Sequence, residues 1–171
     1  MIETLTEYQR LNLLNQYKIL RDLAEMRQDE RTAQYYEELA TIVAEGYLDS
    51  YDQLTQELNE EFPKEDCKLV WDTLRLYSAI YYSFNRLKNP KIKEADFHFD
   101  GFDGNNEFRY YHLCTYIINT LHRFGEFAEN GITDFNSHCR RCDKYRKMLT
   151  KWGEMKEKFE LNEEDIKYLI S

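Results

Sequence analysis

Apolar side chains recur along this chain at the three- and four-residue spacing that is typical of α-helices. In residues 6–26 one apolar stripe is formed by Leu13, Tyr17, Leu20 and Ala24. Thr6 and Gln9 make the capping-box pattern, in which each residue bonds the backbone of the other at the start of a helix. The pattern therefore predicts that the first helix runs from about Thr6 to Met26.

Similar signals predict the remaining helices. Asp29 is suited to cap a second helix, and Gly46 is suited to end it in the left-handed conformation that glycine adopts easily. Pro63 suits the first turn of a long helix. The predicted helices after the first are residues 29–46, 50–59, 64–88, 105–124, 136–152 and 162–170.

Two of these helices, residues 64–88 and 105–124, are apolar on most of their circumference. Such helices are usually buried, so we expect both at the centre of the molecule. Between them, residues 90–104 break the helical spacing, because phenylalanines alternate there with aspartate and glycine. The sequence predicts an all-α, compact single domain of residues 1–171, with six to seven helices and one long Asp/Gly/Phe loop at residues 90–104.

Composition supports this prediction. The 171 residues contain only six glycines and two prolines, fewer than a sheet with many tight turns needs. No apolar run approaches the roughly 20 residues of a membrane span, and the first residues show no basic start and no apolar stretch. The four cysteines are then expected to be reduced thiols. We expect a cytoplasmic protein with no membrane partner.

The net charge of −9 lies entirely in the first third of the chain. Residues 1–63 hold 14 acidic and 5 basic side chains, whereas residues 64–171 hold 18 of each. A basic stripe with helical spacing follows later, formed by Arg140, Lys144, Lys147 and Lys151. This stripe could bind an anionic partner, RNA, or the protein's own acidic third within one subunit or between subunits. The acidic excess makes nucleic acid an unlikely partner, and a solvated face is the commonest role of such a stripe.

The chain contains four separated characteristic blocks: RLNLLNQYKIL (10–20), EGY (45–47), FDGFDGNNEFRYYHL (99–113) and YRKMLTKW (145–152). Together they resemble the YfbU family of bacterial proteins. The resemblance covers nearly the whole chain and implies a compact helical domain in the bacterial cytoplasm. It implies no reaction, ligand or catalytic residue. The Cys139-Arg-Arg-Cys142 pair and a slightly longer connection at residues 27–35 depart from the family pattern.

The Asp/Gly/Phe loop and the residues that follow it are the first candidate binding site. Carboxylates and amides on a glycine-rich turn could hold a cation or a polar ligand. The candidate ligand-binding residues are Asp100, Asp103, Asn105, Glu107, Arg109 and Tyr110. The alternative is structural, with a capping aspartate, turn glycines and phenylalanines that fix the loop to the core. The spacing is not that of an EF-hand, and we expect no metal and no cofactor.

Cys139 and Cys142 are a second candidate, because a Cys-x-x-Cys pair beside His138 has the character of a metal or redox site. A structural zinc site needs four ligands, and the sequence contains no second pair of this kind. On a helix of residues 136–152, both cysteines would lie on the same side as Tyr145 and Trp152. We therefore predict that they are packed in the core.

No nucleophile elbow and no phosphate-binding glycine loop is present. The leading hypothesis is a non-enzymatic interaction or regulatory module that self-associates, with Asn12, Asn15 and Ile19 as candidates for a helix–helix or subunit contact. One alternative is a metal- or small-ligand-dependent enzyme or binding protein that uses residues 100–110. The other alternative is nucleic-acid binding through residues 140–151.

Overall fold

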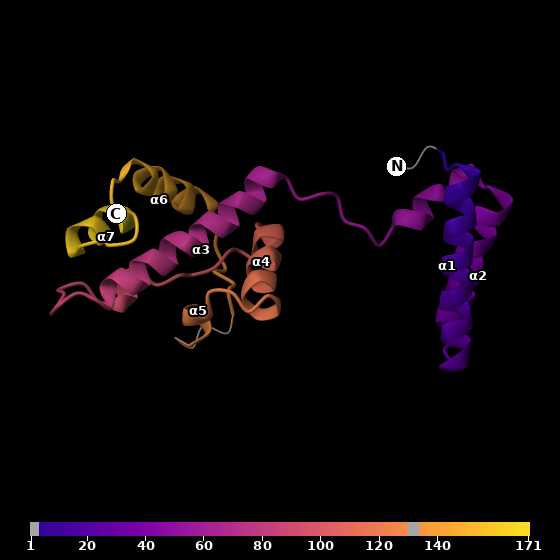
Figure 1. Ribbon diagram of the computed structural model, residues 1–171, viewed down its shortest axis with the longest axis horizontal. Coiled ribbons are helices and arrows are strands. Elements are labelled where there is room, and N and C mark those ends of the chain that lie inside the picture. Colours follow the sequence, from indigo (N-terminus) through magenta and orange to yellow (C-terminus); the bar gives the residue numbers. More distant parts are fainter. Residues whose placement is uncertain (1–3, 130–133) are drawn as a thin grey trace. The chain divides into compact units, whose positions relative to one another are not determined.

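The computed structural model describes residues 4–129 and 134–171, and it confirms the all-α fold (Figure 1). Within these residues there is no β-strand, and a single β-bridge joins Phe102 to Asn136. The chain divides into two compact units, Met1–Glu61 and Phe62–Ser171. Each unit has its own core. The single domain predicted for residues 1–171 stays a prediction.

The first unit is a helical hairpin followed by a 3-10 helix. Helices α1 (Glu7–Met26) and α2 (Glu30–Glu45) lie side by side, and η1 (Leu48–Thr55) follows them. The predicted ends of these helices are confirmed. Thr6 and Gln9 form the capping box, Asp29 accepts from the backbone N–H of Thr32, and Gly46 has a φ of +73°.

The core of this unit is small and one-sided. Its buried side chains are Tyr17, Leu39, Ala40, Ile42, Val43 and Tyr51. Arg10 adds a polar link, because its guanidinium donates to the carbonyl oxygens of Val43 at 2.7 Å and Ala44 at 2.5 Å. These carbonyls lie at the C-terminal end of α2, where a positive charge is favourable. Arg10 therefore links the N-terminal part of α1 to the C-terminal end of α2.

The second unit is built around α3 (Lys64–Phe84), which is the central helix that the sequence predicts. Ten of its residues are buried. It packs against α4 (Phe108–Thr115) and α6 (Cys142–Glu154), and α6 also contacts α7 (Glu163–Ile170). A short α5 (Gly125–Glu129) precedes α6. The sequence therefore identifies this central helix, although the helix ends at Phe84 and not at residue 88.

Three other predicted helices differ more strongly from the structure. The predicted helix 105–124 is a short α4 continued by a π-helix, η3 (Tyr116–Thr120), and its Phe108 and Tyr116 are about half exposed. It is therefore not apolar and buried all round. The predicted helix 136–152 begins only at Cys142, because Asn136 and Ser137 bond to the loop instead. The predicted helix 50–59 is the 3-10 helix η1.

The predicted loop 90–104 lies within a longer connection between α3 and α4. One 3-10 turn, η2 (Glu94–Phe97), interrupts it. Phe97, Phe99 and Phe102 are almost completely buried, so the loop runs through the core of the second unit rather than over its surface. In the part of the chain that the structure describes, no helix has the length and apolar character to cross a membrane.

Candidate functional site

The Asp/Gly/Phe loop is held in place by its backbone. The N–H of Phe102 donates to the carbonyl of Phe135 at 2.9 Å, and the N–H of Ser137 donates to the carbonyl of Phe102 at 3.1 Å. Gly101 has a φ of +83°, and a Cβ at this position would lie 1.9 Å from the carbonyl oxygen of Phe135. Only glycine fits here, because any side chain would collide with that backbone.

Glu107 links the loop to helix α6. Its buried carboxylate accepts from the backbone N–H groups of Arg141 at 3.0 Å and Cys142 at 2.9 Å, and from that of Asp103 at 3.3 Å. The first N–H groups of a helix have no partner within the helix, and a negative charge there is favourable. Glu107 therefore provides the cap of α6 from 34 residues away.

The side chain of Asp103 stabilises the turn that precedes Glu107 by accepting hydrogen bonds. It is almost completely buried, and its carboxylate accepts from the backbone N–H of Asn105 at 2.9 Å and from the side-chain amide of Asn106 at 2.6 Å. The bond from the Asn106 amide, followed by that from Asn105, lowers the pKa of Asp103. Asp103 was one of the candidate ligands, and here both of its oxygens are bonded within the protein.

Asp100 pairs with two cationic side chains, Arg141 directly before α6 and Lys144 within it. Its Oδ2 lies 3.2 Å from Nε of Arg141 and 3.4 Å from Nζ of Lys144. The three candidate carboxylates thus have partners inside the protein and do not converge on one point. Over residues 4–129 and 134–171, no group of three or more His, Cys, Asp or Glu side chains could hold a metal ion.

Half of the candidate ligand-binding residues border one hollow of about 320 Å³. It is lined by Phe62, Pro63, Asp66, Asn106, Glu107, Phe108, Arg109 and Tyr110. Sequence reasoning missed Asp66, which lies 44 residues before Tyr110 and has no local signal that would connect the two. The hollow combines hydrogen-bond donors, carboxylates and aromatic faces, so a small polar or aromatic molecule would suit it.

Tyr110 and Asp66 form the polar centre of this hollow. The phenol of Tyr110 donates to Oδ1 of Asp66 at 2.5 Å, and Arg146 lies 3.8 Å from the same oxygen. Burial and the Asp66 carboxylate raise the pKa of Tyr110 to about 12. The ring of Phe62 meets Tyr110 edge-on at 5.0 Å. Tyr110 is thus held as a hydrogen-bond donor and not as a phenolate base.

The two cysteines of the Cys-x-x-Cys pair do not share an environment. Cys142 is buried in the first turn of α6, whereas Cys139 is exposed and precedes the helix, so the prediction that both pack in the core is wrong for Cys139. Burial, with Glu107 beside it, raises the pKa of Cys142 to about 12. A redox cysteine needs a lowered pKa, because the thiolate is the reactive form.

The basic stripe borders a second hollow, which we call the lysine groove. Its volume is about 600 Å³, and it is lined by Lys144, Lys147, Met148, Thr150 and Lys151 of α6 with Leu169, Ile170 and Ser171. Arg140 is exposed but precedes α6, and it does not line the groove. Three of the four predicted stripe residues therefore line this groove, together with Ile170, which is partly exposed.

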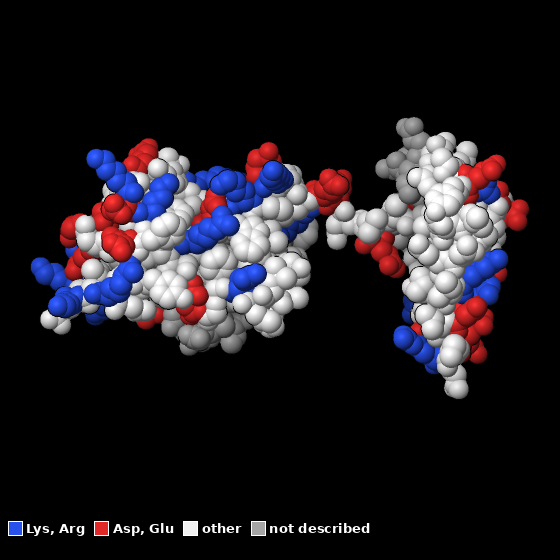
Figure 2. Space-filling model, viewed as in Figure 1, with Lys and Arg blue, Asp and Glu red and all other residues white. Residues whose placement is uncertain are grey.

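The first unit carries an exposed apolar surface, which we call the outer face of α1. Its residues are Tyr8, Leu11, Asn12, Asn15, Ile19, Leu23 and Met26, and all of them are exposed. They lie opposite Tyr17 and Ala24, which are buried. The view in Figure 2 shows uncharged surface along much of the hairpin, with charged side chains at its edges.

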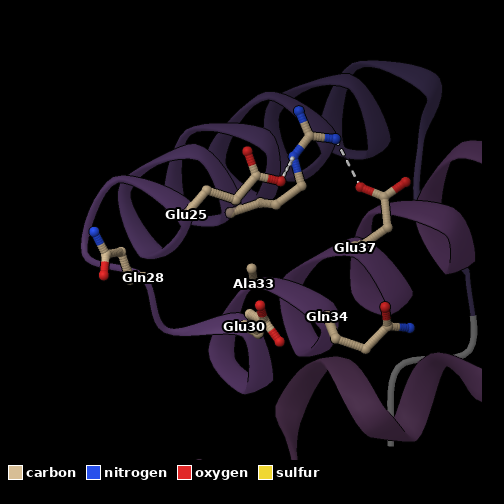
Figure 3. Close-up of a pocket in the computed structure, with 7 residues that line it drawn as sticks. Glu25, Gln28, Glu30, Ala33, Gln34 and Glu37 are labelled. Atoms are coloured by element: carbon tan, nitrogen blue, oxygen red, sulfur yellow. Dashed lines mark hydrogen bonds and ion pairs between the residues drawn. The ribbon is translucent and has the colours of Figure 1, made fainter.

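A third hollow lies within the hairpin, at the end where α1 and α2 are joined (Figure 3). Glu25, Glu30 and Glu37 line it together with Arg21. The guanidinium of Arg21 bonds Glu37 at 2.7 Å and lies 3.9 Å from Glu25. Glu25 and Glu37 are therefore already paired with Arg21. We interpret this hollow as a salt-bridged surface between two helices and not as a binding site.

Comparison with known proteins relates both units to one family. The family model of the YfbU domain matches residues 3–171. A UPF0304 protein (MJECS11) of Methanocaldococcus jannaschii is 34% identical over 169 residues, which cover 95% of this chain and 96% of the relative. That organism is an archaeon, so the family is not confined to bacteria as the resemblance implied. The chain belongs to the YfbU family.

Proposed function

We propose that this protein is a non-enzymatic interaction module of the cytoplasm that self-associates through the outer face of α1. The observation that carries the proposal is the exposure of large apolar side chains there. Tyr8 is 73% exposed, Ile19 60% and Met26 81%. Apolar groups gathered along one helix face are a common mark of a protein contact.

The spacing of the residues on this face suits packing against α1 of a second copy of the protein. Five of its residues, at positions 8, 12, 15, 19 and 26, together with the neighbouring Asp22, follow alternating steps of four and three residues, which is the spacing of a coiled-coil seam. Two copies of α1 paired antiparallel about position 17 would place Tyr8 opposite Met26 and Asn15 opposite Ile19. The same register places the Asn12 amide opposite the Asp22 carboxylate. The face is therefore self-complementary, as a two-fold dimer requires.

Charge also favours a second copy as the partner. The hairpin belongs to the acidic third of the chain, so two hairpins repel each other over most of their surface. The sector of α1 that contains the outer face holds one cation, Lys18, and one anion, Asp22. Two copies can thus approach through this face without net repulsion. One helix pair buries less than a standard interface, so we expect a weak dimer, with a Kd on the order of 10 μM.

Analytical ultracentrifugation of the full chain over a concentration series tests the proposal. We expect a monomer–dimer equilibrium, and Ile19→Asp should shift it to monomer. The variant loses the apolar side chain nearest the centre of the seam and brings the carboxylates of the two copies close together there. Leu48→Asp is the matched control, since Leu48 is an equally exposed apolar residue of the same unit outside α1. A strict monomer at the highest concentration, or equal effects of both variants, would contradict the proposal.

Small-molecule binding at the hollow beside Tyr110 is a second candidate function. It is favoured by the convergence of Glu107, Arg109 and Tyr110 on that hollow. A thermal-shift screen with small aromatic and polar metabolites would test it, with Tyr110→Phe as the site variant and Tyr116→Phe as the control. A compound that shifts the melting temperature of both variants equally does not bind at this hollow.

A further inference from the structure

The lysine groove has the two chemical properties of a peptide-binding surface. The apolar floor is formed mainly by Ile170, which is partly exposed, with Met148 and Leu169 almost completely buried beside it. Lys144, Lys147 and Lys151 provide a cationic rim. An apolar floor is of little use to a phosphate backbone, which is recognised by charge and polar contacts. The groove instead matches a segment that carries both carboxylates and an aliphatic side chain.

The three lysines retain free bonding capacity. Nζ of Lys151 donates to the carbonyl of Tyr168 at 2.8 Å and to Oγ of Ser171 at 3.0 Å, and Lys144 lies 3.4 Å from Asp100. An ammonium group has three donors, so both lysines keep at least one. Lys147 is exposed, and no bond or ion pair joins it to any other residue that the structure describes.

Such an acidic and aliphatic segment exists in the chain itself. Residues 57–61 read Glu-Leu-Asn-Glu-Glu, and all five are exposed. Leu58 is 73% exposed. Glu57 accepts a hydrogen bond from the phenol of Tyr35 at 3.2 Å. From Leu58 onward the segment lies outside any helix, and the N–H of Leu58 donates to the carbonyl of Thr55 at 2.9 Å.

We propose that the lysine groove of one molecule binds residues 57–61 of a second copy. Leu58 would lie on the apolar floor, and the glutamates would pair with the lysines of the rim. The lengths agree, because five extended residues span roughly 13 Å, and the seven-residue separation of Lys144 and Lys151 on a helix is about 10 Å. This contact extends the proposed self-association to a second surface and does not depend on the outer face of α1.

Mixed-isotope crosslinking of the full chain tests this contact. Equal amounts of unlabelled and nitrogen-15-labelled protein are mixed and treated with a carbodiimide, which joins lysine to carboxylate at contact distance. We expect crosslinks between residues 57–61 and the lysines of the groove, with about half of them joining one labelled and one unlabelled peptide, as random pairing of two copies requires.

Charge-reversal variants test which side chains form the contact between the groove and residues 57–61. Lys147→Glu should reduce these crosslinks about tenfold, and Lys156→Glu, the same change on an exposed lysine outside the groove, should leave them unchanged. The swap Lys147→Glu with Glu61→Lys should restore a crosslink between positions 61 and 147. High salt should weaken the contact because exposed charges are screened.

Ile19→Asp separates the two interfaces, since it should abolish the α1 contact and leave the groove crosslinks in place. Loss of the groove crosslinks in Ile19→Asp would show that they depend on the α1 dimer and would overturn an independent second contact. Crosslinks confined to peptides of one isotope would place the segment in the groove of its own chain, and this also overturns the proposal. The absence of any crosslink between residues 57–61 and the groove would overturn the proposal as well.

Discussion

The two units of this protein reach stability in different ways. The hairpin buries six side chains in its cluster and leaves a row of large apolar residues exposed on α1. The hydrophobic cluster of the second unit contains 24 buried residues, and the aromatic rings of Phe99, Phe102 and Tyr145 contact one another inside it. A small one-sided core leaves a surface available for a partner, whereas a dense core fixes a loop in one conformation.

Both tryptophans, Trp71 and Trp152, belong to the second unit. Tryptophan fluorescence therefore follows the unfolding of this unit, and circular dichroism follows both. If the units unfold separately, a substitution in the second unit should move the fluorescence transition and leave the part of the dichroism signal that comes from the hairpin unchanged.

Gly101→Ala should have the largest effect. The new Cβ would meet the Phe135 carbonyl, and alanine is strained at a φ of +83°. We expect the free energy of unfolding of the second unit to fall by about 3–5 kcal/mol, measured by urea titration with fluorescence detection. Gly153→Ala is the control, because that helical position is open and alanine should stabilise it by about 0.5–1 kcal/mol. Equal stability of Gly101→Ala and wild type would contradict this account of the loop.

Glu107→Ala should have the next largest effect. It would leave the N–H groups of Arg141 and Cys142 without their acceptor and open a small cavity. We expect a loss of about 2–3 kcal/mol in the same titration, and a smaller loss for Glu107→Gln, which keeps one acceptor oxygen. Glu154→Gln, at the exposed end of α6, should change the stability by less than about 0.5 kcal/mol.

Tyr110→Phe should cost about 1 kcal/mol near neutral pH, because it removes the hydrogen bond to Asp66. The pKa of Tyr110 is raised to about 12, so its contribution is fully present below the unfolded pKa near 10 and is lost as the pH rises toward 12. The difference between wild type and variant should therefore shrink over this range. Tyr116→Phe, on an exposed tyrosine, should show no such pH dependence; a constant difference from pH 9 to 12 would contradict the role of the phenol.

The last prediction concerns the rates at which the cysteines react with a thiol reagent, and it involves no change in stability. Cys139 should react within minutes with a thiol reagent at neutral pH, because it is exposed. Cys114 and Cys142 should stay protected until the second unit opens, since both are buried and their pKa values are raised by burial. Mass spectrometry of the labelled peptides gives the order of reaction. Labelling of Cys142 as fast as Cys139 would show that the start of α6 is open.

Local signals in the sequence predicted local structure well. The capping box of Thr6 and the left-handed Gly46 are defined by residues three or four apart, and both are confirmed. The start of α6 was placed too early, because its cap comes from Glu107, which no local pattern connects to it. The pairing of Tyr110 with Asp66 was missed for the same reason.

The boundary between the units left only a trace in the sequence. The connecting residues 56–61 contain no glycine, proline or serine, so composition gave no sign of a linker. The acidic excess, however, ends at residue 63, close to the division at Glu61. A change in charge balance marked the boundary that hydropathy did not.

The cap of α6 by Glu107 also sets an order of events in folding. Helix α6 has no side-chain cap of its own, and short helices are marginal without tertiary support. The carboxylate that completes it must first be brought across 34 residues of chain, and closing such a loop costs entropy before any bond repays it. Helix α6 should therefore form late, after the phenylalanines of the loop have collapsed onto α3, and the rate of this step should fall when Glu107 is replaced.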